Sequence, residues 1–367
     1  MSGRPILIIA GGTGGHVFPA LAVAEVLVER RQPVIWLGTR RGVEARIVPQ
    51  AGIPIEWVSV GGLRGKGSAA LLGAPVTLLR AIVQALSVVR RLRPAAVLGM
   101  GGFVAGPGGL AAWLLRLPLI IHEQNTIPGL TNRLLARISA TVLEGFRGSF
   151  PASTRARHVG NPVRRAISAL APPEQRMAGR RGPARLLVLG GSQGALRLNQ
   201  VVPEALVRLP AESRPAVWHQ AGPRTLNVAA EAYRAAEIEV RLEAFIDDMA
   251  AAYRWADLAV CRAGALTVSE LAGAGLGAVL VPFPAAVDDH QTSNAQQLVT
   301  VGAALLIPES ELTAARLAHE LEPLLEDRQR LLDLAHAARA QSMPQAAEEV
   351  ADACLRAAQS PPARTAA

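Results

Sequence analysis

The sequence predicts an α/β protein built from two Rossmann-like domains, each with a parallel sheet. Its 367 residues exceed twice the length of a typical single domain, and half of them are apolar, which is enough for two cores. Short apolar runs alternate with longer segments of helical periodicity along the chain. A glycine-rich turn, Gly11–Gly15, returns about 179 positions later as Gly190–Gly194, so both halves open with a strand, a turn and a helix.

The predicted strands are short runs rich in Ile, Leu and Val, with the low polar alternation expected of parallel strands buried on both faces. Helical periodicity follows the first run over residues 18–31 and follows the run that opens the second half over residues 195–209. In chain order the runs are Ile6–Ile9, Val34–Leu37, Ala96–Leu98, Leu119–Ile121, Leu186–Leu189, Leu258–Val260 and Val279–Val281.

The domain boundary is expected just after Gly160-Asn161-Pro162, ahead of a stretch rich in Arg, Pro and Gly. This gives an N-terminal domain of residues 1–163 and a C-terminal domain of residues 164–342. We expect residues 343–357 to pack back on the N-terminal domain, and residues 358–367 to form a disordered tail.

Composition narrows the classes of partner. The net charge is +9 and comes almost entirely from arginine, which suits a phosphorylated small molecule, an anionic lipid or nucleic acid. Aromatic residues make up only 4% and do not interleave with basic ones, so nucleic acid is the least favoured partner. Two cysteines cannot make a disulfide framework, and the sequence shows no spaced Cys/His or carboxylate cluster for a metal.

Glycine-rich turns between a strand and a helix present backbone N–H groups and a helix N-terminus to an anion, above all to a phosphate. Three such turns occur, at Gly11–Gly15, Gly99–Gly102 and Gly190–Gly194. The dinucleotide fingerprint G-x-G-x-x-G fails because Val17 stands where it needs glycine, and no Walker pattern surrounds Lys66. The turns therefore favour a ligand that contains a pyrophosphate.

Polar residues gather where predicted strands end, which is where doubly wound sheets bind ligands. His16 follows the first glycine turn, and His122-Glu123-Gln124-Asn125 follow an apolar run. In the second half, Thr267, Ser269 and Glu270 open a helix. No nucleophile elbow is present, so we expect polar transfer from a phosphate-bearing donor.

Seven motifs, which run in order from about residue 5 to residue 355, together resemble the MurG family of bacterial N-acetylglucosaminyl transferases. They are Gly11-Gly12-Thr13-Gly14-Gly15-His16-Val17-Phe18-Pro19, Gly62-Leu63-Arg64-Gly65-Lys66-Gly67, Gly99-Met100-Gly101-Gly102-Phe103-Val104, His122-Glu123-Gln124-Asn125, Gly160-Asn161-Pro162-Val163-Arg164, Gly190-Gly191-Ser192-Gln193-Gly194-Ala195 and the stretch from Cys261 to Glu270.

The resemblance implies an inverting, metal-independent glycosyltransferase of the GT-B fold, in which the parallel sheets of the two Rossmann-like domains face each other across a cleft. Such an enzyme moves GlcNAc from UDP-GlcNAc to the C4 hydroxyl of MurNAc in undecaprenyl-pyrophosphoryl-MurNAc-pentapeptide (lipid I), which gives lipid II for peptidoglycan synthesis. It implies a peripheral protein on the cytoplasmic face of the bacterial inner membrane, with no cofactor besides the donor substrate. Its partners would be UDP-GlcNAc, lipid I, an anionic phospholipid surface, and other cell-wall and division proteins.

The resemblance also assigns binding residues. The pyrophosphate of lipid I would meet Gly14, Gly15, Gly101 and Gly102, and Thr13 and Asn125 would lie with Gly14 and Gly15 near the reacting sugars. The C-terminal domain would bind the donor, with Arg164 and Ile246 beside uracil and Glu270 at the ribose hydroxyls. The diphosphate would meet Ser192 and the backbone of Ala265, Leu266, Thr267, Val268, Ser269 and Glu270. GlcNAc would meet Gln291 and Asn294. The stretch Asp288-Asp289-His290-Gln291 departs from relatives that have two glutamines, so His290 receives no role.

Inversion needs a base for the acceptor hydroxyl and a charge stabiliser for the departing UDP. His16 and Glu123 are both candidates for the base, and the sequence leaves the choice open. Two alternative functions remain open. One is another nucleotide-sugar enzyme, such as a glycolipid glycosyltransferase or a UDP-GlcNAc epimerase, and the other is a nucleotide-binding regulator without turnover. Polar residues at strand ends in both halves argue against the regulator.

Residues 71–89 are apolar but contain Pro75, Arg80 and Gln84, so a membrane-spanning helix is not expected. From Pro75 onward Leu79, Ile82, Val83, Leu86 and Val89 share one helical stripe, and Arg90, Arg91 and Arg93 close the segment. Such a stripe fits a helix packed on the sheet and also one whose exposed end meets an anionic bilayer.

Overall fold

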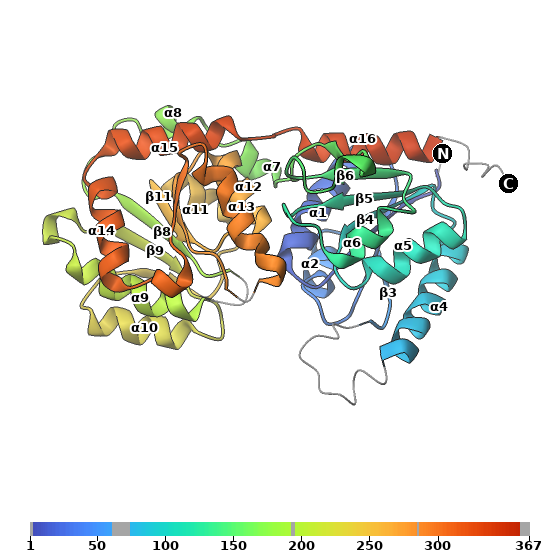
Figure 1. Ribbon diagram of the computed structural model, residues 1–367, viewed down its shortest axis with the longest axis horizontal. Coiled ribbons are helices and arrows are strands. Elements are labelled where there is room, and N and C mark those ends of the chain that lie inside the picture. Colours follow the sequence, from blue (N-terminus) through green and yellow to red (C-terminus); the bar gives the residue numbers. More distant parts are fainter. Residues whose placement is uncertain (1–2, 61–73, 192–194, 285, 360–367) are drawn as a thin grey trace. The chain divides into compact units, whose positions relative to one another are not determined.

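The computed structural model describes residues 3–60, 74–191, 195–284 and 286–359 (Figure 1). The chain forms two compact units: unit 1 comprises Met1–Arg164 and Gln345–Ala367, and unit 2 comprises Arg165–Pro344. Both limits fall close to the boundaries expected from the sequence.

Unit 1 is built on a seven-stranded, all-parallel sheet with the order β3-β2-β1-β4-β5-β6-β7. The order reverses between β1 and β4, so the turns after these two strands lie next to each other at the carboxyl edge. The strands are β1 (Ile6–Ala10), β2 (Val34–Gly38), β3 (Ile55–Trp57), β4 (Ala96–Gly101), β5 (Leu119–Glu123), β6 (Thr141–Glu144) and β7 (Arg157–His158).

Helices cover both faces of this sheet because its strands are apolar on both sides. One core joins Ile6 and Ile8 of β1 to the helices α1 and α16, and the other joins Leu7 and Ile9 to α4 and α5. The helices of unit 1 are α1 (Gly14–Glu29), α2 (Glu44–Gln50), α4 (Ala74–Leu92), α5 (Ala105–Leu114), α6 (Leu130–Leu135) and α16 (Ala346–Gln359).

The C-terminal helix α16 packs on α1, β4 and β5 of unit 1. Val350, Ala351 and Cys354 are buried in that core, and Asp352 pairs with Arg30, the C-cap residue of α1. The expected tail was wrong at its first two residues, because the helix continues through Gln359 and Ala358 packs against the core. Alanine, a strong helix former, fills this turn. Residues 360–367 lie outside the described residues.

Unit 2 repeats the topology with a six-stranded parallel sheet of order β10-β9-β8-β11-β12-β13. The order reverses between β8 and β11, which correspond to β1 and β4 of unit 1. The strands are β8 (Arg185–Leu189), β9 (Ala216–Gln220), β10 (Arg241–Glu243), β11 (Leu258–Cys261), β12 (Ala278–Leu280) and β13 (Ala304–Leu306).

One face of the second sheet packs on α9 and α14 through a core that includes Leu198, Val202, Leu317 and Leu321. The helices of unit 2 are α7 (Arg165–Ser168), α8 (Pro173–Met177), α9 (Leu196–Arg208), α10 (Leu226–Ala235), α11 (Met249–Trp255), α12 (Ala265–Ala274), α13 (His290–Val299), α14 (Ala314–Leu325) and α15 (Arg328–Ala340). Every strand run expected from the sequence is a strand, which confirms that part of the fold prediction.

Helix α4 buries a narrower face than its apolar stripe suggests. Ala81, Ala85 and Val88 are buried, whereas Leu79 and Val83 are 63% and 57% exposed. The buried alanines face the neighbouring helix α5, which is rich in glycine and alanine and allows a close approach. None of the helices in the described ranges is long and apolar enough to cross a membrane.

Candidate active site

The first glycine turn connects β1 to α1 and places His16 in the first turn of that helix. Gly101, the last residue of β4, comes so close that a Cβ there would lie 2.7 Å from His16 Nδ1, and Gly101 has a φ of +106°. Gly102 (φ +81°) packs equally tightly, since its Cβ would meet the Gly11 carbonyl at 2.2 Å. Only glycine fits both positions, so the two turns form one surface around His16.

Three side chains form a hydrogen-bonded chain that ends on His16. Gly160 accepts a hydrogen bond from His122 Nε2 (2.9 Å), His122 Nδ1 lies 3.1 Å from Gln124 Nε2, and Gln124 Oε1 lies 2.9 Å from His16 Nδ1. The amide orientation of Gln124 is fixed independently, because its Nε2 also donates to the His122 carbonyl at 3.1 Å.

The direction of this chain determines the tautomer of His16. His122 is fully buried, and burial lowers its pKa to about 4, so its ring is neutral at pH 7. A carbonyl can only accept, so His122 Nε2 carries the proton and Nδ1 accepts from Gln124. Gln124 Oε1 can only accept as well, so His16 donates from Nδ1. In the tautomer that this bond selects, the free lone pair of His16 lies on Nε2.

Glu123 follows His122 as the last residue of β5, but its side chain lies in a different environment from that of His122. Glu123 is 2% exposed, and its carboxylate accepts four hydrogen bonds, three from the loop that follows β5 and one from Asn132 of α6. Oε1 accepts from the backbone and side-chain nitrogens of Asn125, and Oε2 accepts from Gly129 N and Asn132 Nδ2, all at 2.9–3.1 Å. Glu123 thus fixes the position of Asn125.

A second buried carboxylate supports the first glycine turn. Glu44 is fully buried at the start of α2, and its Oε2 accepts from Gly12 N at 2.9 Å. Its Oε1 accepts from the backbone nitrogen and the hydroxyl of Thr39, at 3.0 and 2.8 Å. Glu44 holds the turn that carries Thr13, Gly14 and Gly15.

In unit 2, α12 begins directly after β11, with Gly264 as its N-cap. The first backbone N–H groups of this helix, from Ala265 to Thr267, have no partner within the helix and point toward the carboxyl edge of the sheet. Glu270, one turn further on, is 4% exposed and accepts from the Tyr253 hydroxyl at 3.1 Å. Leu266, Val268 and Ser269 complete this turn.

The remaining residues that the resemblance assigns to the donor lie in several different environments. Asn294 is fully buried in α13 and donates to the Ala263 carbonyl at 3.3 Å, so it fixes the loop before α12. Gln291 accepts from Phe283 N at 2.9 Å, and Ile246 is buried. Arg164 belongs to unit 1, where its guanidinium lies over the Phe18 ring. Ser192 lies outside the described residues.

Comparison with known proteins identifies the family. Residues 6–144 match the glycosyltransferase family 28 N-terminal domain, and residues 185–350 match the glycosyltransferase family 28 C-terminal domain. A UDP-N-acetylglucosamine--N-acetylmuramyl-(pentapeptide) pyrophosphoryl-undecaprenol N-acetylglucosamine transferase from Alkalilimnicola ehrlichii is 61% identical over 96% of this chain and 98% of its own length. The chain belongs to the MurG family of glycosyltransferases.

Two further relatives agree. The transferase of the same name from Nitrosococcus oceani is 58% identical over 96% of this chain and 98% of its own length. The crystal structure of Acinetobacter baumannii MurG is 40% identical, with a TM-score of 0.81 over 96% of this chain and all of that chain. The predictions of family, of the two-domain GT-B fold and of glycosyltransferase activity are confirmed.

Within this MurG-family fold the structure brings His16, Gly101 and Gly102 together, and it places Glu123 beside Asn125. Sequence reasoning missed the roles of Gln124, Glu44 and Tyr253. The role of Gln124 could have been found from strand periodicity, because His122 and Gln124 point to one side of a strand and Glu123 points to the other. No group of three or more His, Cys, Asp or Glu placed to hold a metal occurs among the described residues.

Proposed function

We propose that this chain transfers GlcNAc from UDP-GlcNAc to the C4 hydroxyl of MurNAc in lipid I, with inversion at the sugar, and so makes lipid II for peptidoglycan synthesis. The carrying observation is the hydrogen-bonded chain that leaves His16 Nε2 as a free acceptor at the carboxyl edge of the unit 1 sheet. The identity to relatives that carry this activity in their names supports the substrates.

His16 acts as the general base in this proposal. Its Nε2 takes the proton of the acceptor hydroxyl as the oxygen attacks C1 of GlcNAc, and the bond from C1 to the UDP oxygen breaks with its electron pair going to UDP. Gln124 holds the ring so that Nε2, and not Nδ1, faces the acceptor. Glu123 is a positioning residue, because its carboxylate is buried and accepts four hydrogen bonds from Asn125, Gly129 and Asn132.

The remaining groups bind substrate. Backbone N–H groups of Gly14, Gly15, Gly101 and Gly102 receive the pyrophosphate of lipid I. The N-terminus of α12 stabilises the charge that develops on the diphosphate of UDP, and Glu270 accepts hydrogen bonds from the ribose hydroxyls. Ser192, Arg164, Ile246, Gln291 and Asn294 stay assigned to the donor.

Acceptor-dependent release of UDP tests this function. We expect purified protein to release UDP from UDP-GlcNAc only when a lipid-linked MurNAc-pentapeptide is present, and to yield a disaccharide. Formation of UDP-ManNAc without acceptor would identify an epimerase instead. Binding of UDP-GlcNAc with no turnover on any acceptor would identify a regulator. An acceptor blocked at the C4 hydroxyl is the matched control and should give no UDP.

We also infer that unit 1 binds an anionic phospholipid surface at the cytoplasmic face of the membrane. The neighbouring helices α4, α5 and α6 (Figure 1) expose large apolar side chains. Val76 on α4 is 71% exposed, and Leu130 on α6 is 66% exposed. Arg80 and Arg90 on α4 are exposed as well, which suits headgroup phosphates.

Vesicle binding tests this surface. Binding to phosphatidylglycerol vesicles should exceed binding to phosphatidylcholine vesicles and should weaken as salt rises. Leu79→Ser with Arg80→Glu should reduce vesicle binding and spare turnover of a soluble short-chain acceptor. The matched control, Val207→Ser with Arg208→Glu on α9 of unit 2, should leave binding unchanged. Equal binding by both double variants would place the membrane contact elsewhere.

A further inference from the structure

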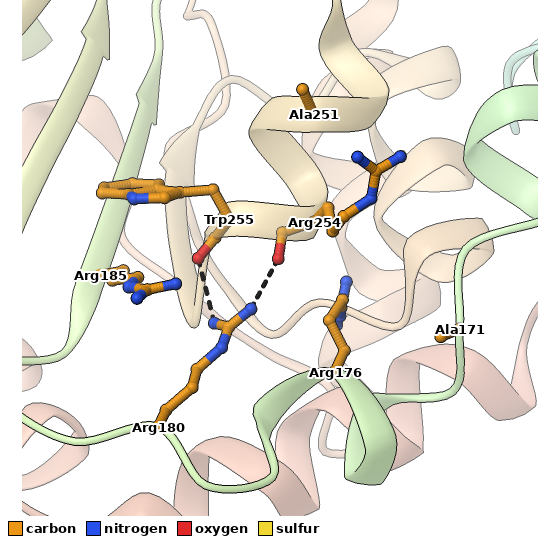
Figure 2. A pocket seen from close by; sticks show the side chains of 7 residues that line it. All are labelled: Ala171, Arg176, Arg180, Arg185, Ala251, Arg254 and Trp255. Carbon is orange, nitrogen blue, oxygen red and sulfur yellow. Dashed lines mark hydrogen bonds between the residues drawn. The ribbon is translucent and has the colours of Figure 1, made fainter.

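Unit 2 contains a pocket of about 420 Å³ whose lining is dominated by arginine. This volume falls in the range of pockets that hold small ligands. The pocket lies beneath the C-terminal end of α11, next to the first residue of β8 (Figure 2). Its lining residues are Ala171, Arg176, Arg180, Arg185, Ala251, Arg254 and Trp255.

Two of the arginines form the frame of the pocket. Arg180 donates to the carbonyls of Arg254 and Trp255, as Figure 2 shows, and pairs with the buried Asp257. Arg176 donates to the Tyr253 carbonyl at 3.1 Å and to the Gly275 carbonyl at 2.6 Å. These bonds satisfy carbonyls at the C-terminal ends of α11 and α12, and they hold both side chains in place.

Other donors in the pocket have no protein acceptor. The guanidinium groups of Arg185 and Arg254 form no hydrogen bond or ion pair with any described residue. The Nε of Arg176 is buried and also lacks a partner. A buried donor left unsatisfied costs about 1–3 kcal/mol, which a bound acceptor would remove.

Charge around the pocket is unbalanced. Four arginines line it, and among the described residues the acidic side chain that forms an ion pair with one of them is Asp257, which pairs with Arg180 and also with Arg328. Burial and the neighbouring Arg180 lower the pKa of Arg176 to about 10, which is the direction expected where positive charge is in excess. An anion in the pocket would relieve this repulsion.

We propose that this arginine pocket is a binding site for a phosphate-class anion, a phosphate or pyrophosphate group of a soluble compound or of a lipid headgroup. The guanidinium groups of Arg185 and Arg254, together with Arg176 Nε, offer more hydrogen-bond donors than one carboxylate can accept. A tetrahedral oxyanion suits them better, because its oxygens point in several directions. In Figure 2 Arg185 reaches toward Arg180, Arg176 reaches toward the end of α11, and Arg254 points away from Arg180, so the donors line different parts of the pocket.

The pocket is distinct from the donor half-site in the same unit. Arg185 begins β8, whereas the glycine turn assigned to the donor follows Leu189 at the other end of that strand. The five residues of β8 separate the two ends by roughly 16 Å. Arg176 nevertheless holds the carbonyl of Tyr253, whose hydroxyl donates to Glu270, so the two sites share α11.

Inorganic pyrophosphate is the probe that tests the site in the full-length protein. Titration is carried out with saturating UDP present, so that the donor half-site is occupied. Arg185→Gln with Arg254→Gln removes the two arginines that make no side-chain bond, so the fold should be retained. Arg208→Gln with Arg234→Gln removes the same charge from exposed helix positions of unit 2 and is the matched control.

We expect wild-type protein to bind pyrophosphate, with an affinity that falls as salt rises. The pocket double variant should bind about tenfold or more weakly, and the control should stay within about twofold of wild type. Absence of binding to wild type, or equal binding by all three proteins, would overturn the proposal. Phosphatidylglycerol vesicles added to the same proteins distinguish the two sources of the anion. If the vesicles displace pyrophosphate, the ligand is a lipid headgroup. If they do not, it is a soluble compound.

Discussion

Gln124→Met tests whether Gln124 sets the tautomer of His16. The substitution keeps the length of a side chain that is 1% exposed, but it removes the amide that bridges His122 and His16. The bond to His16 contributes about 1 kcal/mol, and leaving His122 Nδ1 buried without a donor costs about 1–3 kcal/mol of folding stability. Because the His16 ring can then turn or change tautomer, we expect kcat to fall by about one to two decades.

The prediction is sharpest as a double-mutant cycle. His16→Ala alone should lower kcat by ~10²–10⁴-fold, the usual effect of removing a positioned acid or base. If Gln124 acts through His16, adding Gln124→Met to His16→Ala should lower kcat no further. Turnover is measured by UDP release with saturating donor and acceptor, and the KM for UDP-GlcNAc should stay near the wild-type value.

A control separates orientation from general destabilisation. Tyr233→Phe removes a hydrogen bond to the buried Nδ1 of His219 in unit 2, at 2.9 Å, and should lower stability while leaving kcat unchanged. Additive losses of kcat from His16→Ala and Gln124→Met would refute the reasoning, because they would mean that Gln124 acts independently of His16.

Three further predictions follow from buried groups. Glu270→Ala should raise the KM for UDP-GlcNAc by about one to two decades, since charge-assisted bonds to two ribose hydroxyls are lost; an unchanged KM would remove Glu270 from the donor site. Glu44→Gln should lower both Tm and kcat, because its amide nitrogen would face Gly12 N; unchanged values would show that the turn needs no carboxylate. Burial lowers the pKa of His122 to about 4 and of His219 to about 3, below the usual 6.5, so the unfolded chain binds more protons as pH falls through that range. Each histidine should lower the free energy of unfolding by about 1 kcal/mol per pH unit from about pH 6 toward pH 4, and by nothing above pH 7. Denaturant titrations at several pH values measure this. They would contradict it if the free energy of unfolding of His219→Gln fell with pH as steeply as that of the wild type.

Local signals carried the fold prediction. Buried parallel strands are continuous apolar runs, and glycine turns mark where each half begins, so both were visible without tertiary information. Short strands at the sheet margins, such as β3 (Ile55–Trp57) and β10 (Arg241–Glu243), were not predicted because they carry polar residues and are only partly buried.

The side-chain network was beyond the reach of the sequence. Whether His16 or Glu123 is placed to act as a base depends on Gln124 and on the Gly160 carbonyl, which lie far from His16 in the chain. The apolar stripe of α4 was also ambiguous: periodicity gave equal weight to Leu79 and Val89, and only packing buries Val89 and exposes Leu79. Burial, and not pattern, separates a core residue from one on a binding surface.

Single-turnover transfer of labelled GlcNAc from UDP-GlcNAc to lipid I, in wild type and in His16→Ala, tests the base role of His16. Wild-type protein should form a labelled lipid-linked disaccharide. His16→Ala should form it ~10²–10⁴-fold more slowly while binding UDP with wild-type affinity. Transfer at the wild-type rate by His16→Ala, or loss of UDP binding in that variant, would contradict a base role for His16.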